Sequence, residues 1–406
     1  MSQSALYVLL TLVFFEWLDF SLYLYLARDL FAKQFFPPSN YNLMLSFVLF
    51  AAGYLARPLG GWLFGRIADQ NGRRKPLLWS SALMGVATIG ICLIPNYTQI
   101  GLLSTSFLLA LRICQGLALG GEVNTSAMYL IEHSSKKTMI AGSLSAAIGA
   151  LGMFVGGMLA ALIQSITISW LWRVIFACVG FFSLAVCYCR KQLAESPEFS
   201  KQQLPAVLGF WQSHWRGLCN IAAAGSFVSV TIYLCNVFWL SFAIDHKLWS
   251  NLQCLWIASF AQCASAFLAL PIAMIAKPEH ASGLLRLSML LSILVAPTLF
   301  YFTEQQMVHA VLFALAGYVC TNGLLCASLY YFLYQQLPPY YRCRGVSTTW
   351  AIAATLGAVC LPIAQHGILS GFYWLPGFLV AVNSLLCFLI INFCRTNDRS
   401  ILVRFP

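Results

Sequence analysis

The stretch GYLARPLGGWLFGRIADQNGRRK, residues 53 to 75, joins an apolar segment to two groups of charges. Arg57 and Pro58 lie inside the apolar part, whereas Asp69 and a run of cations follow where the hydrophobicity ends. A charged side chain at the centre of a membrane helix costs about 2.5–3.5 kcal/mol on insertion scales, so it is rarely kept without a role. The stretch therefore predicts a membrane helix with a functional arginine, followed by a specific charged turn.

The rest of the chain has the composition of a membrane protein. It has 406 residues, of which 60% are hydrophobic and only 9% are charged, against about 25% in ordinary soluble domains. Its apolar runs of about 20 residues are long enough to cross a bilayer, and lipid requires isolated spans to be helical. Glu16 and Asp19 indicate that the first run is a retained span and not a signal peptide. We predict an all-α polytopic fold with about 12 spans, at residues 5–27, 43–64, 77–95, 101–130, 139–163, 172–189, 218–243, 252–276, 284–303, 308–334, 345–369 and 372–394.

The net charge of +11 reflects membrane topology and not nucleic-acid binding, because the cations alternate between loops. One set of loops holds 17 of the 23 cations: Arg66, Arg73, Arg74, Lys75, Lys136, Lys137, Arg190, Lys191, Lys201, Arg216, Lys277, Arg286, Arg342, Arg344, Arg395, Arg399 and Arg404. The opposite loops hold Arg28, Lys33, Arg173 and Lys247. The positive-inside rule then places both termini in the cytoplasm and the chain in the cell membrane, in contact with lipid.

One polar segment divides the predicted spans into two groups of six. It reads RKQLAESPEFSKQQLPAVLGFWQSHWR, residues 190 to 216. We predict an N-terminal six-helix bundle at 1–189, a cytoplasmic linker at 190–217 and a C-terminal six-helix bundle at 218–406. Two such bundles, related by an internal repeat, are typical of alternating-access carriers. The counterpart of the first stretch, ALPIAMIAKPEHASGLLRLS at 269–288, lacks the Asp and the Gly-Arg-Arg.

The charged turn after the second span has the pattern G-x-x-x-D-x-x-G-R-R, formed by Gly65, Asp69, Gly72, Arg73 and Arg74. Gly65 would permit a close helix approach, and Gly72 suits a tight turn. Asp69 lies where one helix ends and the next begins, so it can pair with a cation or a helix N-terminus. We interpret the turn as a gate, and the alternative is a basic turn that only anchors the chain at the lipid headgroups.

Charged and polar side chains inside the first-half spans are candidates for substrate and proton binding. Glu16 and Asp19 are three residues apart and share a helix face, as do Gln115 and Glu122, seven apart. Arg112 and Arg57 lie nearby, and Pro58 predicts a local kink beside Arg57. One carboxyl group could carry a proton, since burial favours its neutral form, and an arginine could bind a carboxylate bidentately. The alternative is a fixed ionic network that holds the bundle together.

The second half offers neutral candidates at depth, namely Tyr233, Asn236 and Asn322. The 15 cysteines are scattered without metal-ligand spacing, so we expect no metal and no cofactor. The sequence also has no Ser/His/Asp constellation, no HExxH or other metal-binding motif and no phosphate-binding loop, which argues against an enzyme.

Several stretches resemble the major facilitator superfamily, and within it the metabolite:H+ symporter family of α-ketoglutarate, citrate, shikimate and proline/betaine carriers. These are ARPLGGWLFGRIAD (56–69), FFEWLDF (14–20), LRICQGLALGGEVNTSAMYLIE (111–132) and the sixth span with its following loop. The resemblance is strong in the first half and thin in the second. It implies a monomeric proton-coupled symporter that imports a small carboxylate-bearing or zwitterionic metabolite. A superfamily exporter of drugs or siderophores, working by proton antiport, is the alternative, and the substrate stays open.

Overall fold

A computed structural model of the chain describes residues 3–37, 41–134, 137–166, 168–189, 195 and 210–394. All regular elements in these residues are helical. The first half comprises α1 (Gln3–Leu26), the π-helix η1 (Ala27–Phe31), α2 (Ala32–Gln34), α3 (Asn42–Leu55), α4 (Arg57–Asn71), α5 (Arg74–Leu93), α6 (Tyr97–Ile100), α7 (Leu102–Glu132), α8 (Thr138–Ser165) and α9 (Leu171–Cys189).

The second half has the same construction. It comprises α10 (Phe210–Ser213), α11 (Trp215–Ile232), the π-helix η4 (Tyr233–Phe238), α12 (Trp239–Asp245), α13 (Asn251–Ile275), the 3₁₀ turn η5 (Pro278–His280), α14 (Ala281–Glu304), α15 (Val308–Tyr334), α16 (Pro339–Leu369) and α17 (Leu375–Phe393). Eleven helical stretches of the described residues are long and apolar enough to cross a membrane, and the apolar helix at Leu171–Ala185 is shorter. The prediction of an all-α protein with about 12 spans is thereby confirmed.

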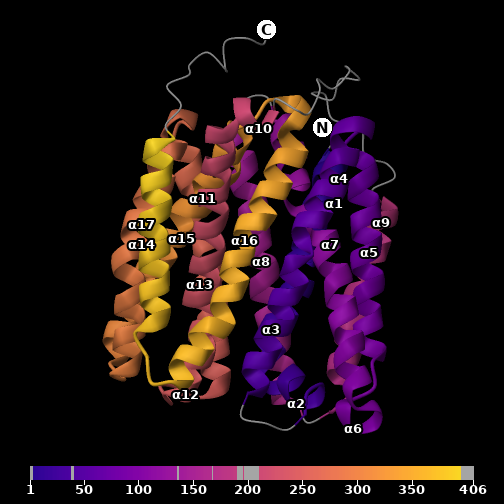
Figure 1. Cartoon of the computed structure of the whole chain (residues 1–406), viewed down its shortest axis with the longest axis vertical. Coiled ribbons are helices and arrows are strands. Elements are labelled where there is room, and N and C mark those ends of the chain that lie inside the picture. Colours follow the sequence, from indigo (N-terminus) through magenta and orange to yellow (C-terminus); the bar gives the residue numbers. More distant parts are fainter. Residues whose placement is uncertain are drawn as a thin grey trace.

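The helices up to α9 lie on one side of the molecule and those from α11 on the other (Figure 1), and we call these two groups the first and the second bundle. Between the bundles, α8 packs on α13 and α15, and α16 packs on α3 and α4. Most of the predicted linker at 190–217 lies outside the described residues, and its last part is helical in α10 and α11. One end of the molecule carries α10 (top of Figure 1), and the other carries α2, α6 and α12 (bottom). We call the end where α4 finishes the Asp69 end and the end that holds η1 and α2 the Arg28 end.

The helix axis is interrupted beside the arginine of the second span, as the proline predicted. Pro58 has no backbone N–H and its ring excludes the carbonyl of the preceding turn, so a helix cannot continue through it undisturbed. Accordingly α3 ends at Leu55, α4 begins at Arg57, and Ala56 bonds back to the Gly53 carbonyl at 3.3 Å. This break places the Arg57 side chain in the interior of the first bundle.

Close contact with α7 holds this part of the second span in position. A Cβ atom on Gly120 would lie 2.1 Å from the Arg57 carbonyl oxygen, and one on Gly116 would lie 1.9 Å from the Gly53 carbonyl oxygen. Only glycine permits backbones to approach so closely, which is how small residues serve packing between membrane helices. The contact brings Arg57 on α4 and Arg112 on α7 into the same region.

Candidate functional site

A chain of hydrogen bonds in the first bundle joins three helices. Asp19 on α1 accepts two bonds at Oδ2, one from Thr88 Oγ1 at 2.8 Å and one from Gln115 Nε2 at 2.9 Å. Gln115 in turn accepts a bond from the Arg112 guanidinium at 2.6 Å. Asp19 is only 1% exposed, and its other oxygen, Oδ1, is buried without a hydrogen-bond partner. A buried carboxyl group with one unused oxygen has a position available for a proton.

Two buried guanidinium groups lie beside this chain, each against an aromatic ring. The Arg57 guanidinium carbon is 3.5 Å from the centre of the Tyr54 ring, and that of Arg112 is 3.7 Å from the Tyr23 ring. In the described part of the chain neither arginine forms an ion pair with a carboxylate, and Arg57 Nε has no hydrogen-bond partner. Cation–π contacts compensate such a charge only in part, by about 2 kcal/mol when desolvated. These arginines thus keep capacity for an anionic ligand.

The other two first-half acids lie elsewhere. Glu122 on α7 accepts a bond from Ser81 Oγ on α5 at 2.8 Å. Ser81 and Thr88 are two turns apart on α5, as Glu122 and Gln115 are on α7, so the two helices meet at two polar levels. Glu16 on α1 is 4% exposed and lies within electrostatic reach of Arg57 and of Tyr330 in the second bundle.

The neutral candidates of the second bundle face the first bundle or a cavity. The Tyr233 hydroxyl contacts that of Tyr54, and Asn236 Oδ1 accepts a bond from Tyr25 at 2.9 Å. Both candidates lie in the π-helix η4, a type of helical irregularity that is frequent at functional sites. Asn322 on α15 instead donates to Gln262 Oε1 on α13, at 3.0 Å.

A central cavity of about 50 Å³ lies where the bundles meet. The first bundle contributes Trp17 of α1 and small residues of α8, and the second contributes Gln262, Asn322, Tyr330 and Trp350. A smaller hollow, which we call the guanidinium recess, is lined by Arg57, Arg112, Gln115 and their neighbours Phe20, Phe50, Gly53, Tyr54, Gly116 and Leu119. Cargo could be held in these two spaces, at the interface that alternating-access carriers use.

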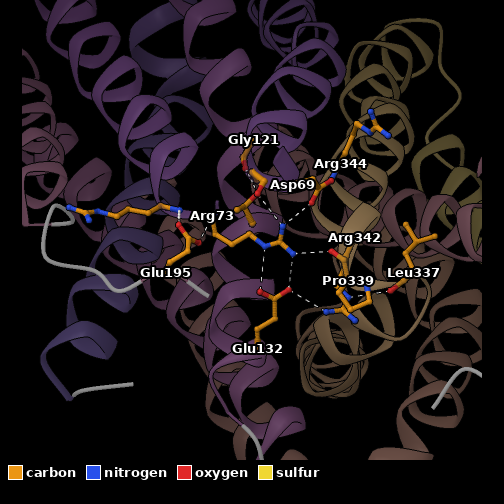
Figure 2. A network of polar contacts seen from close by, with 12 residues as sticks. Asp69, Arg73, Gly121, Glu132, Glu195, Leu337, Pro339, Arg342 and Arg344 are labelled. Carbon is orange, nitrogen blue, oxygen red and sulfur yellow. Dashed lines mark hydrogen bonds and ion pairs between the residues drawn. The ribbon is translucent and has the colours of Figure 1, made fainter. Parts of the chain in front are cut away.

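The predicted gate residues lie in a buried ionic network at the Asp69 end (Figure 2). Asp69 Oδ1 pairs with the Arg73 guanidinium at 2.9 Å, and Asp69 Oδ2 accepts a bond from the backbone N–H of Arg344 at 2.9 Å. Arg73 is 1% exposed and also donates to Glu132 Oε1 at 3.1 Å. Arg342 donates to the same Glu132 oxygen at 3.2 Å. The network therefore joins both bundles, because α16 supplies Arg342 and Arg344.

The glycines of the same motif have the expected roles in its geometry. A Cβ on Gly65 would lie 2.7 Å from the Arg344 Cα atom, so α4 and α16 touch at this point. Gly72 has a φ of +96°, a conformation that glycine adopts without strain. The backbone N–H groups of Arg73 and Arg74 donate to the Glu195 carboxylate at 2.6 and 3.5 Å.

The bundles are also tied at the Arg28 end. Arg28, in η1 of the first bundle, pairs with Asp245 of α12 at 2.5 Å and donates to the Ser241 carbonyl at 3.0 Å. The side chains of this pair are 27% and 40% exposed, unlike those of the buried network at the other end. Contacts between the bundles thus lie at both ends of the molecule, with the cavity between them.

The structure brings together four of the nine binding candidates that the sequence singled out. Gln115 is hydrogen-bonded to both Asp19 and Arg112, and Arg57 adjoins them in the recess. Glu122 and Asn322 lie apart from that cluster. Sequence reasoning did not single out Thr88, Glu132, Gln262, Asp245 or Tyr54. For Glu132 and Gln262 a signal existed, since both are polar residues within or at the end of apolar runs.

Comparisons with known proteins agree on the class of protein. The family described as sugar (and other) transporters matches residues 8–204. The chain is 29% identical over 397 residues to the α-ketoglutarate permease of Escherichia coli strain K12, covering 88% of this chain and 87% of that protein. It is 30% identical over 281 residues to the shikimate transporter of the same strain, covering 62% of this chain and 64% of that protein.

Two solved structures share the fold. The human organic anion transporter MFSD10 (TETRAN) superposes with a TM-score of 0.75 at 16% identity, covering 96% of this chain and all of that one. The proton:xylose symporter XylE of the major facilitator superfamily superposes with a TM-score of 0.66 at 16% identity, covering 97% of this chain and 96% of that one.

Proposed function

Because the chain resembles transporters in sequence and the major facilitator superfamily in fold, we propose that it belongs to that superfamily and imports a small organic anion together with protons. Like these transporters, the chain is a multi-pass secondary transporter and not an enzyme. We propose four properties: the cargo is an organic anion, transport is coupled to protons, its direction is inward, and the working unit is a monomer.

The observation that carries the proposal is that, among the described residues, the buried Arg57 and Arg112 guanidinium groups form no direct ion pair with a carboxylate. An uncompensated charge inside a membrane is costly, and removal of one partner from a buried ion pair costs about 3–5 kcal/mol. Arg57 and Arg112 both line the guanidinium recess. A bound carboxylate would supply the missing counter-charge through bidentate hydrogen bonds. The substrates named for the two bacterial relatives, α-ketoglutarate and shikimate, are both carboxylates.

Asp19 is the group that we assign to the coupling proton. Its Oδ1 is free, and its Oδ2 is linked through Gln115 to Arg112. A change in the charge of Asp19 therefore alters the field at a cargo-binding arginine. Protonation of Asp19 leaves Arg112 less compensated by fixed negative charge, which strengthens its attraction for an anion. Binding of H+ and of the anion would thus favour each other, as symport requires.

The ties at the two ends suit the alternating-access cycle. With contacts at both ends, the geometry corresponds to a closed intermediate, and opening one end exposes the cavity to one side of the membrane. We place the Asp69 end in the cytoplasm, because the charged turns there include Arg73, Arg74, Lys75, Arg342 and Arg344.

A binding experiment on purified protein tests the anion site. Thermal shifts with α-ketoglutarate, citrate, shikimate, proline and betaine should identify the ligand of the wild-type protein. Arg57→Gln should abolish that shift, because it removes the charge that faces the recess. Arg66→Gln, on the same helix but exposed, is the matched control and should bind normally. Unchanged binding by Arg57→Gln would exclude the proposed anion site.

Uptake into proteoliposomes tests the coupling. Asp19→Asn should lose accumulation driven by an inward proton gradient and keep counterflow of the same ligand, since only the proton step is removed. In the wild type the Glu122 carboxylate bonds to Ser81, outside the recess. Glu122→Gln should therefore retain both gradient-driven accumulation and counterflow. If Asp19→Asn accumulates ligand as the wild type does, the assignment of the coupling proton to Asp19 is wrong, and if Glu16→Gln and Glu122→Gln do so as well, none of the three acids carries it. Outward, gradient-driven movement would favour the exporter alternative.

A further inference from the structure

We propose that Gln262 binds the cargo from the second bundle, donating a hydrogen bond from Nε2 to an oxygen of the cargo distant from its carboxylate. This inference rests on the proposed function and adds the chemical class of the cargo. The cargo would be an organic acid that carries, besides the carboxylate bound by the arginines, a hydroxyl, ketone or other oxygen acceptor.

The orientation of the Gln262 amide is fixed by its neighbours. Gln262 lies on α13, is 1% exposed and lines the central cavity. Its Oε1 accepts two hydrogen bonds, from Tyr318 at 2.9 Å and from Asn322 at 3.0 Å. Tyr318 Oη and Asn322 Nδ2 donate in these bonds, so the amide oxygen faces these two side chains and the amino group points the other way. The binding geometry of the donor is thereby preorganised.

The amino group of the Gln262 amide has a weak hydrogen-bond partner. Gln262 Nε2 donates to the thioether sulfur of Met153 on α8, at 3.5 Å. A thioether is a poor acceptor, so this contact returns little of the energy lost by burying an amide. Met153 also lines the cavity, and it belongs to the opposite bundle. An oxygen of the cargo could replace the sulfur with a net gain.

The cavity and the guanidinium recess are separated by a thin aromatic partition. Trp17 lines the cavity, Phe20 lines the recess, and their ring centres are 5.7 Å apart. The Phe20 ring is also 6.2 Å from that of Tyr233, which follows the cavity residue Ile232. The lining of the cavity therefore adjoins that of the recess through these ring contacts, and the proposal requires one molecule to reach both the arginines and Gln262.

The chemistry of the cavity limits what that second contact can be. None of the residues that line the cavity carries a formal charge. Its polar side chains are two amides, a tyrosine and two tryptophans, whose N–H and O–H donors suit a neutral oxygen acceptor. In this proposal the first bundle binds the carboxylate of the cargo, and the second bundle binds a neutral oxygen of the same molecule.

The test compares ligands that possess or lack the second acceptor. Shikimate and α-ketoglutarate carry oxygen acceptors beyond one carboxylate, whereas betaine carries none. Gln262→Leu should raise the dissociation constant of the wild-type protein's ligand among the first two by about threefold to tenfold, the range for one hydrogen bond. Any affinity for betaine should stay unchanged. Met153→Leu, a volume-conserving change that removes only the sulfur acceptor, should leave the affinity for shikimate and α-ketoglutarate equal or higher.

The outcomes separate this inference from the proposed function. Equal affinities of wild type and Gln262→Leu for shikimate and α-ketoglutarate would overturn the inference alone. A parallel loss for betaine would also overturn it, because it would indicate damage to the fold. Wild-type protein that binds betaine and neither of the other two would overturn the assigned cargo class. Wild-type protein that binds and transports none of the organic acids would overturn the proposed function, and this inference with it.

Discussion

The two turns that occupy equivalent places in the two bundles close against their neighbours by different forces. The turn between α4 and α5 buries Asp69 and Arg73 in a network with Glu132 and Arg342. The turn between α13 and α14 carries Lys277 and Glu279, whose side chains are 75% and 70% exposed and 4.0 Å apart. Near that second turn, Met139 of α8 packs into a small apolar cluster with Ala269, Ala273 and Ala281.

This difference shows that a shared helical plan does not require the same kind of contact at equivalent turns. A buried ion pair is directional and costly to break, whereas apolar packing is non-directional and tolerant of sliding. The second half lacks the Asp and the Gly-Arg-Arg of the first turn, and this difference in sequence predicts that the two turns do not close in the same way. The ionic contacts described for the two turns differ accordingly, and the partner of the first turn is the start of α16.

The largest effect should come from the shared acid of the ionic network. Glu132→Gln leaves both Arg73 and Arg342 with one carboxylate fewer, which should weaken closure at the Asp69 end by about 3–5 kcal/mol. Hydrogen exchange of residues 339–345 should rise, and transport should fall because the cycle stalls with this end open. Glu279→Gln in the counterpart turn is the matched control and should leave both properties at wild-type values. Equal effects of the two variants would remove the contrast between the turns.

An intermediate effect is expected where packing replaces charge. Met139→Ala empties space among buried small residues, and truncation of a buried Met costs about 2–5 kcal/mol in protein cores. We expect the lower limit here, with faster hydrogen exchange at 269–281 that does not depend on salt. Met139→Leu keeps the volume and should stay close to wild type. A salt-dependent response at 269–281 would argue that charges close this half as well.

The smallest effect should come from the exposed pair at the Arg28 end. Arg28→Gln removes an ion pair to Asp245 that is open to solvent, and such pairs contribute about 0–1 kcal/mol. We expect hydrogen exchange of residues 239–247 to rise a few-fold at most in low salt, and to match wild type at 1 M salt, where the screening length is about 3 Å. A larger change that persists at high salt would place the main closure at this end.

Some residues of the candidate site could be predicted from the local sequence, because a charged residue within an apolar run can be recognised without knowledge of the fold. Glu16, Asp19, Arg57 and Arg112 stand out as charges within apolar runs, and the structure buries all four. The break beside Arg57 followed from Pro58 alone. The Asp19 partner Thr88 did not follow, because it is an ordinary polar residue whose contacts depend on how its helix is rotated about the helix axis.

The sequence by itself determined that this is an all-helical membrane protein of about 12 spans, with charge concentrated inside its first half. It did so because the cost of exposing backbone and charge to lipid acts on each segment separately. Only the tertiary structure decided that Glu132 joins Arg73 to Arg342, which lies 210 residues beyond Glu132 in the chain. It also decided that Gln262 faces Met153 across the bundle interface. Those contacts depend on the rotation, tilt and spacing of packed helices, which the composition of a single helix does not specify.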